Sequence, residues 1–116
     1  MGRTHTCGEL RAEHAGGKVC LQGWVWHRRD LGGLIFVDLR DRSGSVQLVF
    51  NPEEAAEAHA IAEEWRAEWV VLVEGEVAER PPDTVNDALP TGVIEVQVTR
   101  ADTVAIAETP PFLIEE

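Results

Sequence analysis

The sequence predicts a small all-β domain with one helix, in which five strands close into a barrel. Its 116 residues are enough for one domain and too few for two ordinary ones, and 44% of them are hydrophobic, which supports a packed core. Five segments have the alternation, or the β-branched and aromatic content, of strands. One segment with helical periodicity lies between the third and the fourth of these strands.

The first three strands are expected in the amino-terminal half of the chain. They are predicted at residues 19–26, 34–39 and 46–50. The connections between them, residues 30–33 and 41–44, are short and contain glycine, which is typical of tight turns.

The segment after the third strand has the start signal of a helix. Asn51 can cap it, Pro52 suits the first helical position, and Glu54 completes a box-like pattern at the third. An apolar stripe follows at helical spacing, formed by Ala58, Ile61, Ala62 and Trp65. We expect this helix to end near residues 66–68.

Two more strands are predicted at residues 70–77 and 93–98, joined by a loop at 81–91 that is rich in Pro, Asp and Asn. Three strands, one helix and two strands is the order of the OB-fold. This five-stranded Greek-key barrel binds oligonucleotides mainly on its second and third strands and in two of its loops. We therefore expect one OB-fold domain over residues 1–107. The Thr109-Pro110-Pro111-Phe112 segment predicts an extended exit, so residues 108–116 would begin a linker.

Charge is divided unevenly along the chain. The net charge of −11 argues by itself against a nucleic-acid partner. Residues 1–50, however, contain seven basic and five acidic residues, whereas residues 51–116 contain three basic and sixteen acidic ones. Nine of the ten basic residues are arginines, which stack on bases and hold phosphate in a fork. The first half of the chain could therefore face an anion while the second half faces water.

Several classes of function find no support in the sequence. No run of 18 apolar residues and no signal peptide occurs, so we expect a cytoplasmic protein without a membrane partner. Cys7 and Cys20 form no CxxC pair and the histidines have no ligand spacing, so we expect reduced thiols and no metal site. No nucleophile motif, Walker loop or GxGxxG segment is present, so we expect no catalytic residue.

Alternation along the strands predicts which side chains face outward. In the second strand Ile35, Val37 and Leu39 form the apolar inner set, which leaves Phe36 outside. The same argument places Gln47 and Glu95 on the outer face. An unstacked base can stack on an aromatic ring and form hydrogen bonds through its Watson–Crick edge, so this face suits single-stranded RNA.

Arg28 and Arg29 close the first strand at the edge of this outer face. Alternation does not settle where they point, because Gly23 can mark a bulge that shifts the pattern.

Each of these residues also has a plainer interpretation. Phe36 can be covered by a loop or by another domain, Gln47 and Glu95 can be ordinary solvated residues, and the arginines can pair with nearby aspartates. A general single-strand binder and a protein-interaction barrel therefore remain alternatives.

A set of short motifs spread along the chain carries a resemblance to a known family. The motifs are Arg3-Thr4-His5, Cys7-Gly8-Glu9-Leu10-Arg11, Gly23-Trp24-Val25, residues 28–41, Val46-Gln47, residues 91–96 and residues 109–112. Over nearly its whole length the sequence resembles the N-terminal anticodon-binding domain of bacterial-type aspartyl-tRNA synthetases. Asparaginyl- and lysyl-tRNA synthetases share the barrel and a looser form of the pattern.

The resemblance implies that an OB-fold reads the anticodon bases G (or queuosine), U and C of aspartate tRNA. Phe36 matches the aromatic residue on which the central U stacks, and Gln47 matches an amide that reads this region. Glu95 matches a carboxylate associated with the first base, and Arg29 matches an arginine that contacts the anticodon. The remaining basic positions near the RNA correspond to Arg28, Arg80 and Arg66.

Three positions qualify the resemblance. His27-Arg28-Arg29 stands where the family commonly has three arginines, which weakens the case for one phosphate contact, and Asp83-Thr84 stands where Lys or Asn is usual. Leu31 resembles enzymes specific for aspartate tRNA more than those that also accept asparagine tRNA.

The resemblance also implies a parent aspartate–tRNA ligase. Its catalytic domain would follow the linker in cis and use ATP and Mg²⁺. For the present residues alone we expect no cofactor, no catalysis and no DNA partner.

Overall fold

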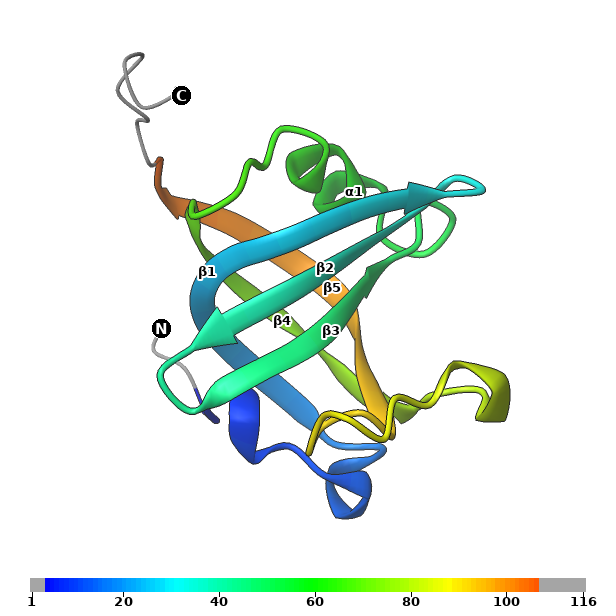
Figure 1. Ribbon diagram of the computed structural model, residues 1–116. Coiled ribbons are helices and arrows are strands. Elements are labelled where there is room, and N and C mark those ends of the chain that lie inside the picture. The colour runs from blue at the N-terminus through cyan, green and yellow to red at the C-terminus, as the bar shows by residue number, and fades with distance from the viewer. Residues whose placement is uncertain (1–3, 107–116) are drawn as a thin grey trace, which may run out of the picture.

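The computed structural model describes residues 4–106, which form a closed barrel (Figure 1). Its strands are β1 (Lys18–Leu31), β2 (Leu34–Asp41), β3 (Gly44–Phe50), β4 (Val70–Glu79) and β5 (Ile94–Ala105). The α-helix α1 (Ala56–Ala62) lies between β3 and β4, and the short 3-10 helices are η1 (Cys7–Glu9), η2 (Ala12–His14) and η3 (Pro82–Thr84). The predicted five-stranded barrel with its helix between the third and fourth strands is confirmed. The predicted linker at 108–116 lies outside the described residues.

The strands follow the order β1-β2-β3-β5-β4 around the barrel. Only the β3–β5 ladder is parallel among those described. The long strand β1 closes the barrel because its first half pairs with β4 and its second half pairs with β2, with Trp24 belonging to both ladders. Gly23 lies at this change of partner. A Cβ atom there would come within 2.4 Å of the Arg40 carbonyl oxygen, so only glycine fits the close approach of the two strands.

The core consists of the inward side chains of all five strands, covered at one end by α1. The predicted inner residues of β2 are buried, and the same alternation buries Val46, Leu48 and Phe50 of β3 and Ile94, Val96 and Val98 of β5. The helical stripe is also confirmed, because Ala58, Ala62 and Trp65 are buried and Ile61 packs against the core. The Trp65 ring meets Phe50 edge to face, with their centroids 5.4 Å apart, which ties the segment after the helix to β3.

The helix is shorter than predicted. The Asn51 side-chain oxygen accepts a hydrogen bond from the Glu53 backbone N–H at 2.9 Å, and its carbonyl oxygen accepts from the N–H groups of Glu54 and Ala55. Asn51 therefore caps a separate turn, and α1 begins only at Ala56. An Asx turn and a helix N-terminus share the same sequence signal, so local pattern does not distinguish them.

No described helix is long and apolar enough to cross a membrane.

Two strands, β1 and β5, are longer than predicted. β1 continues through the polar residues up to Leu31, and β5 continues to Ala105. The added residues are largely exposed and are held by backbone pairing with β2 and β4, so they carry no hydrophobic alternation.

Candidate nucleic-acid interface

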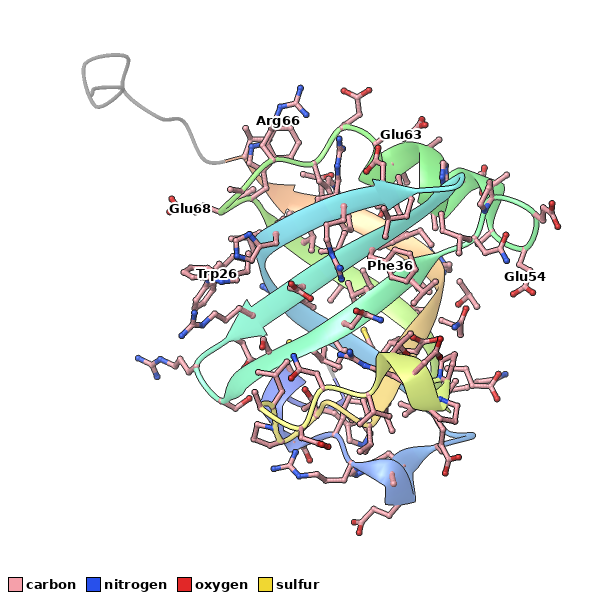
Figure 2. The ribbon with its side chains drawn as sticks, turned by 45° about the vertical axis from the view of Figure 1, so that its right-hand side comes forward. Trp26, Phe36, Glu54, Glu63, Arg66 and Glu68 are labelled. Atoms are coloured by element: carbon pink, nitrogen blue, oxygen red, sulfur yellow. The ribbon has the colours of Figure 1, made fainter. Side chains whose placement is uncertain are left out.

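A groove of about 730 Å³ runs over the outer face of β1, β2 and β3 and is bounded by the β4–β5 connection. It is lined by His27, Arg28, Arg29, Leu31, Phe36, Asp38, Gln47, Arg80, Thr84, Asn86 and Leu89. Five of the seven predicted site residues therefore line this groove, namely Arg28, Arg29, Phe36, Gln47 and Arg80. The Phe36 ring projects from the groove floor (Figure 2).

Strand alternation and a tight turn place Phe36 in the groove. Ile35 and Val37 are buried in the core, which turns the Phe36 ring to the outer face, where it is half-buried. The turn between β1 and β2 consists of Gly32 and Gly33, both with positive φ, at 58° and 90°. This two-residue glycine turn fixes the hairpin register and so pairs Phe36 with Arg29. The Arg29 guanidinium carbon lies 5.6 Å from the centroid of the Phe36 ring.

The polar groups beside Phe36 form one hydrogen-bonded chain. Arg29 Nη2 donates to Gln47 Oε1 at 3.2 Å, and Gln47 Nε2 donates to Glu95 Oε1 at 3.1 Å. Gln97 Nε2 donates to the other carboxylate oxygen, Glu95 Oε2, at 2.7 Å. This series of hydrogen bonds fixes which end of the Gln47 amide faces Arg29, and it holds the Glu95 carboxylate from both sides.

Gln47 and Glu95 are less exposed than the sequence suggested. Both lie on the outer face as predicted and are absent from the apolar core, but their relative exposures are only 6% and 8%. Ordinary solvated residues would be open to water, so the plainer interpretation fails for this pair. Partly shielded groups with unused donor and acceptor positions are suited to a ligand that supplies the missing partners.

A β-bulge settles the directions of the two arginines. The register between β1 and β2 shifts between Val25 and His27, so the extra residue of the bulge is Trp26. The sequence had indicated Gly23 as the candidate bulge position. Arg29 pairs with the outward residue Phe36, and Arg28 pairs with the buried Val37. Because paired residues share a face of the sheet, Arg29 points into the groove and Arg28 points toward α1.

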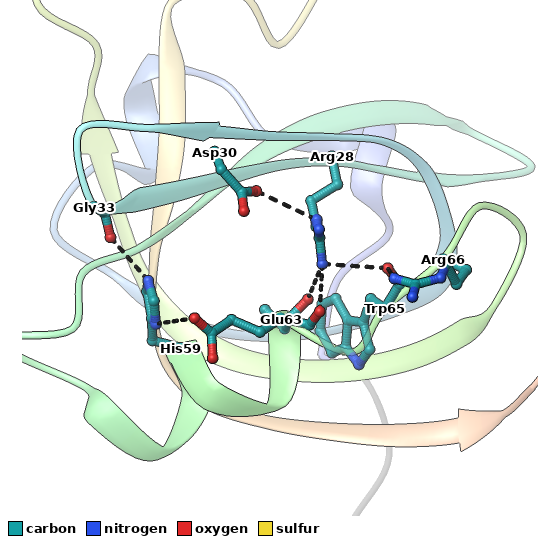
Figure 3. Close-up of polar contacts among 8 residues, drawn as sticks. Arg28, Asp30, Gly33, His59, Glu63, Trp65 and Arg66 are labelled. Carbon is teal, nitrogen blue, oxygen red and sulfur yellow. Dashed lines mark hydrogen bonds and ion pairs between the residues drawn. The ribbon is translucent and has the colours of Figure 1, made fainter.

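Arg28 is engaged inside the fold. Its Nη1 atom donates to the carbonyl oxygens of Ala62, Glu63 and Trp65 at 3.1, 2.6 and 3.4 Å, and its Nε atom lies 3.3 Å from an Asp30 carboxylate oxygen (Figure 3). The Ala62 carbonyl also accepts from the Trp65 backbone N–H at 3.1 Å, and a cation at this helix end suits the helix dipole. Arg28 therefore borders the groove, but its charged group holds the end of α1 in place. The RNA contact predicted for Arg28 stays a prediction.

The remaining two predicted arginines are placed differently from each other. Arg80 is 9% exposed and donates to the carbonyl oxygens of Ile94 at 2.9 Å and Thr84 at 3.1 Å, so it braces the β4–β5 connection. Burial lowers the pKa of Arg80, and the nearby Glu95 and Asp38 carboxylates act in the opposite direction. Arg66 is exposed beyond the end of α1 and is not among the residues that line the groove (Figure 2). The sequence did not separate these situations, because both are isolated arginines near strand ends.

Some lining residues were not predicted as part of the site. Asn86 and Leu89 belong to the irregular connection between β4 and β5. No periodic signal marks such loop residues. The described residues contain no group of three or more His, Cys, Asp or Glu side chains able to hold a metal ion.

Comparison with known proteins connects this groove to a family. Residues 19–104 match the model of the tRNA anticodon family, described as an OB-fold nucleic acid binding domain. The chain belongs to this family of OB-fold nucleic acid binding domains. The match covers the five strands except for one residue at the start of β1 and one at the end of β5, and it includes every residue of the hydrogen-bonded series from Arg29 to Gln97.

Relatives of the chain include aminoacyl-tRNA synthetases. The chain is 56% identical over 114 residues to an aspartate–tRNA ligase of Staphylococcus haemolyticus and 52% identical over 116 residues to an aspartate–tRNA(Asp/Asn) ligase of Desulfatibacillum aliphaticivorans. These matches cover 98% and 100% of the chain but only 19% of either ligase. The structure of asparaginyl-tRNA synthetase from Pyrococcus horikoshii is similar with a TM-score of 0.77 and 32% identity, over 95% of this chain and 24% of that one. The resemblance to the anticodon-binding domain of aspartyl-tRNA synthetases is thereby confirmed.

Proposed function

We propose that the groove binds the anticodon loop of aspartate tRNA and reads the bases G (or queuosine), U and C. The observation that carries this proposal is the combination of an open aromatic ring, Phe36, with a hydrogen-bonded set of a cation, an amide and a carboxylate beside it. Unpaired bases need both a stacking surface and polar groups for their edges, and this groove offers the two side by side on the outer face of the barrel.

The proposed roles follow from the chemistry of the side chains. A uracil would stack on Phe36, as the family resemblance implies for the central base. The Glu95 carboxylate, held by Gln47 and Gln97, has lone pairs left to accept from the N1–H and exocyclic amine of a guanine. Arg29 uses one of its five N–H donors on Gln47 and can offer others to a phosphate or base edge.

Local charge makes RNA binding compatible with a net charge of −11. The groove is lined by three arginines, Arg28, Arg29 and Arg80, and by one carboxylate, Asp38, whereas many of the carboxylates of residues 51–68 lie on the exposed side of α1 and its flanking turns. Fields near a surface are set by nearby charges within about 8–10 Å at physiological ionic strength, so the distant carboxylates are largely screened.

We further propose that the residues act as the tRNA-binding part of an aspartate–tRNA ligase. In such an enzyme ATP and Mg²⁺ would serve amino-acid activation in a catalytic domain in cis. The present groove would contribute affinity and selectivity for the tRNA.

Titration with anticodon stem-loops tests the proposal. We expect the stem-loop with the aspartate anticodon to bind more tightly than loops changed at one base at a time. We also expect Phe36→Ala to weaken binding by about 5- to 150-fold, the range of one base–aromatic stack. Phe36→Tyr, which keeps the ring, is the matched control and should retain most of the affinity.

Two outcomes would contradict the proposal. Equal affinity for a scrambled anticodon would indicate a general single-strand binder. Equal affinity of the wild type and Phe36→Ala for every loop would show that the ring does not stack on a base. A stem-loop with the asparagine anticodon, which differs at the third base, measures whether that tRNA is also accepted.

A further inference from the structure

A second groove, of about 400 Å³, continues the first one along the same face of the barrel. Both grooves are lined by His27, Asp38 and Leu89, so they share a common border. Beyond this border the second groove is lined by Trp26 and Arg40. Neither residue belongs to the set proposed to read the anticodon.

Trp26 is exposed because of the β-bulge. As the extra residue of β1 it has no partner in the ladder with β2, and its side chain projects beside that of His27 on the outer face (Figure 2). Its relative exposure of 44% is high for a tryptophan, whereas Trp65 is 1% exposed. Single exposed hydrophobic residues are common, but this one lies in a groove continuous with a proposed RNA site.

The Arg40 guanidinium stacks over the Trp26 ring, and we call this pair of flat groups the platform. The Arg40 guanidinium carbon lies 4.5 Å from the centroid of the Trp26 ring, which is a cation–π stack. A guanidinium plane and an indole ring both accept a nucleobase by stacking, and the arginine charge also favours a nearby phosphate. The platform therefore has the same two properties, a flat surface and a positive charge, that Phe36 and Arg29 combine in the first groove.

The platform is too far from Phe36 to contact the same base. Arg40 follows Phe36 by four residues on β2, which corresponds to about 13 Å along a strand, whereas stacked rings lie about 4.5–7 Å apart. OB-folds bind about 4–16 nucleotides of a single strand, which is more than an anticodon triplet. A nucleotide outside the triplet can therefore reach the second groove.

We propose that Trp26 and Arg40 form an additional stacking site for an unpaired nucleotide that flanks the anticodon triplet. This inference rests on the proposed function, because it extends the same RNA strand along the same face. Stacking on the platform adds affinity without selecting a base, since every base has a π face.

A double-mutant cycle between protein and RNA tests the site. The aspartate anticodon stem-loop is prepared intact and with an abasic nucleotide at each position next to the triplet in turn. We expect an abasic nucleotide on one side to weaken binding to the wild-type chain by about 5- to 150-fold, and Trp26→Ala to weaken binding of the intact loop by a similar factor. Combined, the two changes should have little more effect than either alone, because they remove the same contact.

Three controls make the result specific. Trp26→Phe keeps a ring and should restore most of the affinity, whereas Trp26→Leu keeps apolar bulk without a stacking ring and should not. Val104→Ala removes a comparably exposed apolar side chain from β5, outside both grooves, and should leave every affinity unchanged. Circular dichroism of each variant verifies that the barrel is intact.

The outcomes separate this inference from the proposed function. Additive effects of Trp26→Ala and both abasic nucleotides, with the Phe36 dependence preserved, would overturn only the additional site. A wild-type dimer that Trp26→Ala converts to a monomer, with unchanged RNA affinity, would show that a second copy covers the ring and would also overturn it. Loss of any Phe36 dependence would overturn the proposed function and the additional site together.

Discussion

Arg28 and Arg29 are neighbours in sequence, and the structure predicts that their removal has opposite consequences. Arg28→Ala should destabilise the fold, because its guanidinium is hydrogen-bonded to the end of α1. Arg29→Ala should weaken RNA binding with a smaller effect on stability, because Arg29 is exposed and its hydrogen bond and ring contact are with the groove residues Gln47 and Phe36.

The magnitudes follow from the contacts that each substitution removes. The Arg28 Nη1 atom has two protons for three carbonyl oxygens, and the bonds to Glu63 at 2.6 Å and Ala62 at 3.1 Å are the short ones. Hydrogen bonds to charged groups contribute about 1.5–3 kcal/mol each when well shielded, and the partly exposed ion pair with Asp30 contributes about 0–1 kcal/mol. Since the Arg28 side chain is 25% exposed, we expect a net loss of about 2–3 kcal/mol.

A loss of that size corresponds to a fall in Tm of about 8–12 °C for a domain of this length. Arg29→Ala removes an exposed cation–π contact worth about 0.5–1 kcal/mol and one hydrogen bond of 3.2 Å worth about 0.5 kcal/mol, so its Tm should fall by about 4–6 °C, less than that of Arg28→Ala. In RNA titrations Arg29→Ala should weaken binding by about 10- to 150-fold, the value of one charged hydrogen bond.

Thermal melts and stem-loop titrations, the latter at a temperature where every variant is folded, measure both effects. Arg28→Lys is the matched control: it keeps the charge but loses the planar fork, and should melt between the wild type and Arg28→Ala. Equal melting temperatures for Arg28→Ala and Arg29→Ala would refute the assignment of directions from the bulge. A greater loss of RNA affinity in folded Arg28→Ala than in Arg29→Ala would refute it as well.

Two further predictions concern stability. Burial acts to raise the pKa of the Asp41 carboxyl, but hydrogen bonds donated by Cys7 and Ser43 outweigh it and leave that pKa below its usual value. The stabilisation is therefore fully present above the unfolded-state pKa near 3.9 and is lost as pH falls through the lower folded-state pKa. Asp41→Asn should lower the free energy of unfolding by about 2–3 kcal/mol at pH 7, and urea titrations should show the difference from wild type shrinking in acid; a constant difference would contradict this. Gly75→Ala would bring a Cβ atom to 2.5 Å from the Gln97 carbonyl oxygen and should destabilise the chain by about 1–3 kcal/mol or more, whereas a change below about 0.5 kcal/mol would disprove that close approach.

The polar chain in the groove also has a consequence for how the site is organised before RNA arrives. Gln47 and Glu95 are held by Arg29 and Gln97 in the absence of any ligand. Side chains that are already ordered lose less conformational entropy on binding than free ones, so such a site discriminates bases without first having to fold around them.

The sequence by itself determined the order of elements and the sorting of side chains between the two faces of the sheet. Period-two alternation in β2 was enough to place Ile35 inside and Phe36 outside. A strand has only two faces, and the face toward the core takes the apolar set of side chains. The same reasoning places Gln47 and Glu95 on the outer face.

Only the tertiary structure decided what lies next to what. The insertion of one residue at Trp26 reverses the alternation of β1, so Arg29 enters the groove, Arg28 reaches the end of α1, and Trp26 itself is exposed. A bulge depends on the pairing between β1 and β2, and no local pattern in one strand records it. The contact between Gln47 and Glu95 likewise arises because β5 returns beside β3 from a distant part of the sequence.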